Sequence, residues 1–241
     1  MKIIINIILS LIFLAIIIPI AALTYFGFMP GLSAAFGTNK PRDLGVKYSE
    51  TDRKNAYEKN AVIAVAITPA SASIKDSVRY EGKKDIKITL TGSEISSLIN
   101  SRKWKYSLSQ NVQIRINPDG TGEMSGTLNI NNVLPYISLT HSITEVKDAI
   151  EKYKIGFNPP YYLKGKVEIT NNKVTLNPEQ IEIGRIPIPQ SLITQNQAAV
   201  TTFVEDRLNA IPNLSVRSLK LQNGQAVIDA TVPEKEFTVQ N

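Results

Sequence analysis

Few residues in this chain of 241 residues have types suited to catalysis. His141 is the only histidine, and the absence of cysteine removes thiol catalysis, disulfides and cysteine-ligated metal sites. A lone histidine lacks the partners of a zinc site, and no G-x-S-x-G nucleophile motif accompanies it. Glycine-rich phosphate loops are absent as well. We therefore interpret His141 as a loop residue, and the sequence predicts no catalytic residue, no metal site and no cofactor.

Carboxylates are the second group that could act chemically, because a close pair can supply a general acid and a general base. The candidates stand at predicted turns or at outward-facing strand positions, and they are Asp119, Glu123, Glu168 and Asp229. Asp119 in particular is explained by the turn that it occupies. We expect all four to be solvated surface residues, and we predict that the protein is not an enzyme.

The N-terminal segment from Ile3 to Phe28 is apolar, and no charged residue occurs between Lys2 and Lys40. About 20 apolar residues in a helix cross the hydrocarbon core of a bilayer. We therefore predict a transmembrane anchor over residues 1–28. A cleaved signal peptide is the alternative, but its apolar region would be shorter, roughly 7–15 residues.

Charge gives the anchored protein an orientation and excludes one class of partner. Lys2 before a signal-anchor favours a cytoplasmic N-terminus with the following domain outside the cell membrane, although Lys40 and Arg42 reduce the charge bias. The net charge of +6 is compatible with anionic lipid head groups nearby. The basic residues are scattered, whereas nucleic-acid binding needs a dense patch, so we exclude a nucleic-acid partner.

Helix and turn signals divide the rest of the chain. Residues 29–48 have the composition of a juxtamembrane linker, and residues 49–241 that of one folded domain. Capping boxes predict helices that begin near Ser49, Thr91 and Ser142. Turns at residues 117–120, 171–173 and 223–224 separate alternating apolar runs and predict three hairpins. Residues 61–68 are expected to form a buried strand, with continuation of the preceding helix as the alternative, and residues 191–210 a long helix.

Helices that alternate with hairpins are typical of an α+β fold, because hairpins require antiparallel pairing. We predict a curved antiparallel sheet built from hairpins and packed around the long amphipathic helix. Apolar residues of two predicted helices could line a groove for acyl chains, and they are Ile95, Leu98, Ile99, Val200, Phe203 and Val204. A filled core would have the same apolar composition, so both interpretations stand.

Four segments in a fixed order resemble a known group of proteins. They are residues 90–100, 112–120, 183–189 and 223–228, which contain caps, turns and strand patterns. The chain resembles prokaryotic membrane-anchored or exported proteins of the YpmS and LmeA kind, which are similar in plan to the tubular lipid-binding (TULIP) fold and to YceB-like lipoproteins. The resemblance implies a long helix in a curved sheet and, for some relatives, lipid binding. The lipobox cysteine of YceB-like forms is missing here, and no ligand residue is carried over.

Two functions therefore follow as hypotheses. The first is an extracytoplasmic module for a lipid or another apolar ligand, held at the membrane through Ile3–Phe28. The second is a structural or assembly partner of another protein in a cell-envelope complex, with a filled core.

Overall fold

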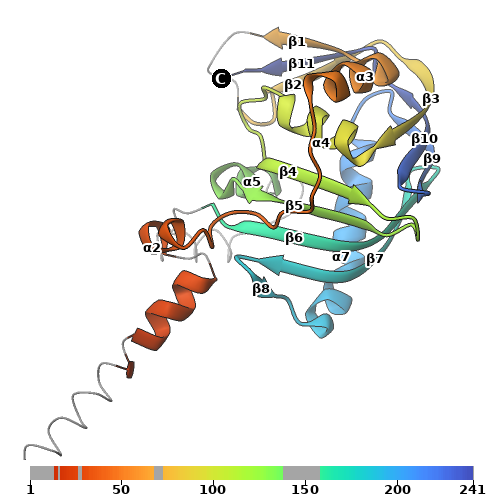
Figure 1. Cartoon of the computed structure of the whole chain (residues 1–241). Helices are drawn as coiled ribbons and strands as arrows, with labels where there is room; N and C mark the ends of the chain where they lie inside the picture. The colour runs from red at the N-terminus through yellow and green to blue at the C-terminus, as the bar shows by residue number, and fades with distance from the viewer. Residues whose placement is uncertain (1–13, 16, 27–28, 68–72, 138–157, 241) are drawn as a thin grey trace, which may run out of the picture.

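The computed structural model describes residues 14–15, 17–26, 29–67, 73–137 and 158–240. Its main feature is an eight-stranded antiparallel sheet that curls into a half-barrel, with a long helix packed on it (Figure 1). A three-stranded sheet and two shorter helices lie at one end of the half-barrel. The predicted α+β class and the curved antiparallel sheet are thus confirmed.

The large sheet is built around strand β6. Its members are β3 (Lys84–Thr91), β4 (Ser109–Ile116), β5 (Gly122–Leu128), β6 (Pro160–Thr170), β7 (Lys173–Ile183), β8 (Ile186–Pro187), β9 (Ser215–Gln222) and β10 (Gln225–Val232). The order is β3-β10-β9-β6-β5-β4, and β7 joins β6 to β8. The first half of β6 pairs with β5 and its end pairs with β9, while β7 runs along β6 for its full length. The β4–β5 hairpin and the β9–β10 hairpin therefore pair with successive parts of β6.

The hairpin turns follow from residues that accept a left-handed backbone. Asn171 and Asn172 between β6 and β7 both have positive φ, as do Asn223 and Gly224 between β9 and β10. Two consecutive left-handed residues make the type I′ turn, whose twist matches that of the strands. The three predicted hairpins are present at their predicted places.

Helix α4 (Gly92–Ser101) covers the outer edge of β4 with polar side chains. Ser96 Oγ accepts from the Ile114 N–H at 2.8 Å. Asn100 accepts from the Val112 N–H at 2.9 Å and donates to its carbonyl at 2.7 Å. The close approach requires Gly92, since a Cβ there would lie 2.2 Å from the Ile114 carbonyl oxygen. An edge strand that would otherwise expose unpaired backbone groups is thereby closed.

Helix α7 (Gln190–Asn209) begins and ends within one residue of its prediction. Val204 and Leu208 pack against a buried cluster contributed by β6, β7, β9 and β10, which consists of Ile169, Val174, Val216, Ala230 and Val232. Ile193 is also buried, but Leu192 and Val200 are half exposed. The helix thus packs on the sheet through part of its predicted apolar stripe.

The small sheet contains β1 (Ile63–Ile67), β11 (Lys235–Val239) and β2 (Val78–Glu81) in that order, with β1 parallel to β11. The prediction that residues 61–68 form a buried strand is wrong in its burial, because Ile63 is 56% exposed. The reason is that β1 is an edge strand that pairs with β11 alone. Helix α3 (Glu50–Asn60) precedes it and has the predicted capping box at Ser49. Helix α5 (Ile130–Ile137) follows β5.

The N-terminal part consists of a helix over residues 17–25 and the short helix α2 (Pro30–Ala35), and it extends from the domain (Figure 1). Most of the predicted anchor lies outside the described residues. Among the residues that are described, no helix has both the length and the apolar character needed to cross a membrane. His141 and the helix predicted from Ser142 also lie outside them.

Candidate functional site

Residues 40–46, here called the strap, cross the half-barrel sheet on the way from α2 to α3 (Figure 1). Leu44 is buried at 4% exposure. Its N–H donates to Gln113 Oε1 at 2.8 Å, and its carbonyl accepts from Arg115 Nη1 at 3.3 Å. Both side chains come from β4. The segment predicted as a linker is therefore docked on the sheet over part of its length.

Under the strap lies a buried carboxylate with several donors. Glu123 accepts from Arg115 Nη2 at 2.6 and 2.8 Å, from Asn117 Nδ2 at 2.9 Å and from the Tyr162 hydroxyl at 2.8 Å. The prediction of a solvated Glu123 is wrong, because the residue is only 6% exposed. The prediction assumed that polar residues of β5 face water. In the structure, polar partners from β4, from the turn after β4 and from β6 surround Glu123 instead.

The titration of this group reflects its surroundings. Burial alone would raise the pKa of Glu123, but the hydrogen bonds from Asn117, Arg115 and Tyr162 outweigh it and hold the pKa below its usual value. Burial and the adjacent carboxylate raise the pKa of Tyr162 to about 12. Glu123 is therefore a charged acceptor, and Tyr162 a neutral donor, over the ordinary range of pH.

Arg42 joins the strap to the far side of the sheet. Its Nη2 lies 2.8 and 2.9 Å from the two carboxylate oxygens of Glu182 on β7. Its guanidinium carbon lies 3.8 Å from the centre of the Tyr162 ring. Because one face stacks on an aromatic ring and one edge binds a carboxylate, Arg42 serves to hold the strap in place.

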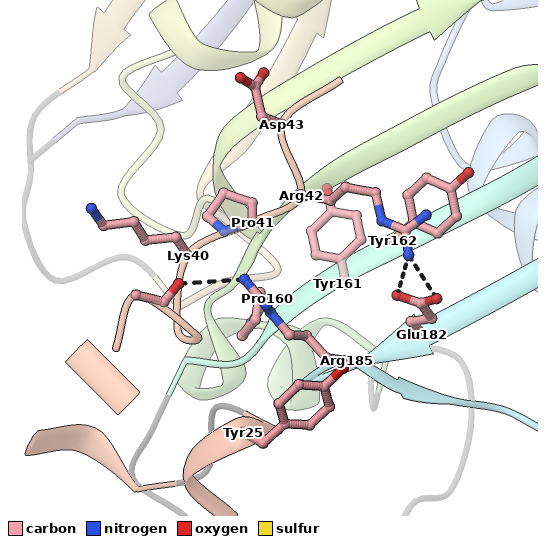
Figure 2. Close-up of a pocket in the computed structure, with 11 residues that line it drawn as sticks. Tyr25, Lys40, Pro41, Arg42, Asp43, Pro160, Tyr161, Tyr162, Glu182 and Arg185 are labelled. Atoms are coloured by element: carbon pink, nitrogen blue, oxygen red, sulfur yellow. Dashed lines mark hydrogen bonds and ion pairs between the residues drawn. The ribbon is translucent and has the colours of Figure 1, made fainter. Parts of the chain in front are cut away.

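A hollow of about 520 Å³ opens beside this network. Figure 2 shows its lining, which includes Tyr25, Lys40, Arg42, Tyr161, Glu182 and Arg185. Tyr25 belongs to the N-terminal helix, Lys40 and Arg42 to the strap, and the others to the sheet and its turns. The site thus combines the end of the N-terminal helix with the body of the domain.

Arg185 occupies the turn between β7 and β8. Gly184 and Arg185 have φ values of 59° and 61°, and Ile183 pairs with Ile186 across them. They form a two-residue turn of the type that favours Asn and Gly. The guanidinium of Arg185 donates to the carbonyl of Gly37 at 3.4 Å (Figure 2). Within the described part of the chain, neither Arg185 nor Lys40 has a carboxylate at ion-pair distance.

This arrangement favours binding of an anion. Among the described residues, Lys40 and Arg185 have no carboxylate at ion-pair distance, whereas Glu182 is paired with Arg42 and Glu123 with Arg115. Asp43 also lines the hollow, and its carboxylate accepts from the Gly45 N–H. No group of histidine, aspartate and glutamate residues in the described ranges could hold a metal ion. The chemistry available here is hydrogen bonding and charge neutralisation of a ligand.

The six residues of the predicted apolar groove lie in different environments. Ile95, Leu98 and Ile99 are half buried on α4, whose fully buried face is instead polar: Glu94, Ser96 and Ser97. Val204 packs in the core of the sheet, and Val200 is half exposed. The ring of Phe203 lies 6.3 Å from that of Tyr136 on α5. Helix α4 packs mainly on α3 and β4, and α7 mainly on β7. The groove stays a prediction.

Sequence reasoning missed the residues of the hollow. Tyr25 was considered only as part of the predicted anchor, and Lys40 and Arg42 only for their effect on membrane orientation. The signal for Arg185 was present, because a glycine at position 184 interrupts alternating isoleucines at 181, 183 and 186, as a two-residue turn does. Nothing in the local sequence places Lys40 or Arg42 near this turn, which is more than 140 residues away.

Comparisons of the chain with protein-family models, with curated proteins and with solved structures found no match.

Proposed function

We propose that the protein is a single-pass membrane-anchored module whose extracytoplasmic domain binds lipid. The observation that carries the proposal is the position of the hollow. Its cations, Lys40 and Arg185, line the same hollow as Tyr25, which ends the helix over residues 17–25 within the predicted anchor. Head groups of anionic lipids would occupy this level if Ile3–Phe28 spans the bilayer.

Exposed apolar side chains near the hollow also support its position at the level of the lipid head groups. Phe36, directly after α2, is 74% exposed, and Leu32 on α2 is 42% exposed. Apolar and aromatic groups beside a membrane-spanning segment are favoured at the boundary between head groups and acyl chains. In water their exposure would be unfavourable.

A photoreactive lipid tests the proposal in native membranes. The full chain is expressed, a lipid with a photoreactive group near its head is added, and crosslinked peptides are mapped by mass spectrometry. We expect crosslinks in residues 36–43 and 182–186 in addition to the anchor. Crosslinks confined to residues 1–28 would show that the domain takes no lipid.

An assembly role in a cell-envelope complex is the second candidate. It is favoured by two observations: Val204 and Leu208 of α7 pack into the core, and the edge of β1 exposes Ile63. An exposed edge strand can accept a strand of a partner. Crosslinking from position 65 on β1 in native membranes would favour this role if it recovers one stable protein partner.

A further inference from the structure

We propose that Arg185 binds a phosphate ester in the hollow, with Lys40 supplying a second positive charge. The ligand is defined by its chemistry, a phosphate on a small polar group, and an anionic phospholipid or a free phosphate ester could supply it. The lipid source rests on the proposed function, whereas the phosphate site does not.

The backbone at Arg185 is the first argument. Its φ of 61° lies in the left-handed region, where a side chain with a Cβ is disfavoured and glycine or asparagine is preferred. The turn would form more easily with either of them at position 185. An arginine at this position therefore opposes local stability, and such positions point to a role for the side chain itself.

The hydrogen-bonding capacity of Arg185 is the second argument. A guanidinium has five N–H donors in a planar fork that matches the oxygens of a phosphate. In Arg185 one of them meets the Gly37 carbonyl at 3.4 Å, a long bond. Arg42 offers the contrast in the same hollow, since its guanidinium is held by Glu182 and by the Tyr162 ring.

The distribution of charge is the third argument. Glu182 is neutralised by Arg42 and accepts a further bond from Gln180 at 2.6 Å. Asp43 accepts from the Gly45 N–H at 2.8 Å, and its carboxylate points away from Arg185 (Figure 2). The charged side chains that line the hollow are Lys40, Arg42, Arg185, Asp43 and Glu182, which leaves one net positive charge. Within the described residues, neither Lys40 nor Arg185 forms an ion pair. The hollow's volume of about 520 Å³ is within the range of small-molecule sites and accommodates a phosphate with its glycerol.

The test uses the full chain in micelles of an uncharged maltoside detergent. Glycerol 3-phosphate and dihexanoylphosphatidylglycerol are titrated separately by calorimetry, with glycerol as the uncharged control. The variants are Arg185→Gly, Lys40→Ala and both together. The matched control removes two exposed lysines elsewhere, Lys83→Ala with Lys103→Ala, and so lowers the net charge equally.

We expect Arg185→Gly to weaken binding of both phosphate ligands at least tenfold and Lys40→Ala to weaken it by a smaller factor. The control should bind as the wild type does. The melting temperature of Arg185→Gly should equal or exceed that of the wild type, because glycine suits a left-handed turn. A loss of affinity without a loss of stability separates a ligand contact from a structural role.

Each failure has its own meaning. If Arg185→Gly binds both ligands as tightly as the wild type, the phosphate site is refuted, while retained binding of the phospholipid would leave the proposed function in place. If the wild type binds glycerol 3-phosphate but not the phospholipid, the phosphate site is supported, and the lipid source fails together with the proposed function. If the wild type binds neither ligand, the inference is overturned.

Discussion

Glu123 shows how a single residue can organise one face of the sheet. Its carboxylate accepts hydrogen bonds from β4, from the turn after β4 and from β6. Arg115, one of these donors, also donates to the Leu44 carbonyl and so connects Glu123 to the strap. A buried carboxylate is stable only when such donors replace water. The Glu123 carboxylate and its donors therefore connect β4, β5, β6 and the strap on this face of the sheet.

Replacing Glu123 by Gln should destabilise the protein by about 2 kcal/mol, because hydrogen bonds to a charged group are lost and the Arg115 charge loses its partner. Arg115 is half exposed, so water compensates part of that loss. Urea unfolding of both proteins measures the difference. Glu168→Gln is the matched control, since its pair with Lys220 is exposed and should contribute little.

The contribution of Glu123 should depend on pH. Its pKa in the folded protein lies below the ordinary value of 4.5, so the folded state favours the charged form. The stabilisation is complete above pH 4.5 and is lost as the pH falls through the folded pKa. We expect the difference in unfolding free energy between wild type and Glu123→Gln to shrink below pH 4.5. A difference that stays constant down to pH 3 would contradict the assignment.

At the scale of elements, helix α4 takes the place of a neighbouring strand at the free edge of β4. Asn100 satisfies both backbone groups of Val112, a residue with no exposed surface. The helix was predicted from its capping box, which the structure contains. Its orientation was not, because the apolar stripe of Ile95, Leu98 and Ile99 indicated burial of the opposite face.

Asn100→Ala should cost about 3 kcal/mol, since it leaves the N–H and carbonyl of Val112 buried without partners. Asn55→Ala on the exposed face of α3 is the control, and it should be neutral or slightly stabilising because alanine has the higher helix propensity. Thermal unfolding of the two variants measures the contrast. Equal melting temperatures would mean that α4 is not held through this side chain.

The limits of sequence prediction are visible in the same elements. Caps, Asn-rich turns and alternation are local signals, so α3, α4, α7 and the hairpins could be predicted. Pairings between distant segments have no local signal. The parallel pair of β1 with β11, the polar contact between α4 and β4, and the strap over Glu123 depend on such pairings, and so does the meeting of Lys40 with Arg185.

At the scale of the whole molecule, if the predicted anchor spans a membrane, its orientation decides on which side the hollow lies. The chain has no cysteine, so a single introduced cysteine reports on one position without a background. Thr202 on α7 is exposed and suits this purpose. With the domain outside the cell, Thr202→Cys should react with a membrane-impermeant maleimide in intact cells, whereas Lys2→Cys should react only after permeabilisation.

The reverse labelling pattern would place the hollow in the cytoplasm and exclude the extracytoplasmic assignment. Labelling of both positions in intact cells would indicate leakage of the reagent, whereas loss of labelling at position 2 even after permeabilisation would indicate cleavage of the N-terminal segment. Immunoblotting for a shorter product checks for cleavage independently.

The junction between the N-terminal helix and the domain also has a mechanical consequence. Ser33 and Thr38 both donate to the Thr24 carbonyl, and Arg42 and Leu44 then fasten the strap to the sheet. A flexible linker of about 20 residues would let a domain sweep a radius of roughly 25 Å. This junction removes most of that freedom. The domain therefore has little freedom to swing relative to the N-terminal helix, and any ligand or partner has to arrive at the hollow by its own diffusion.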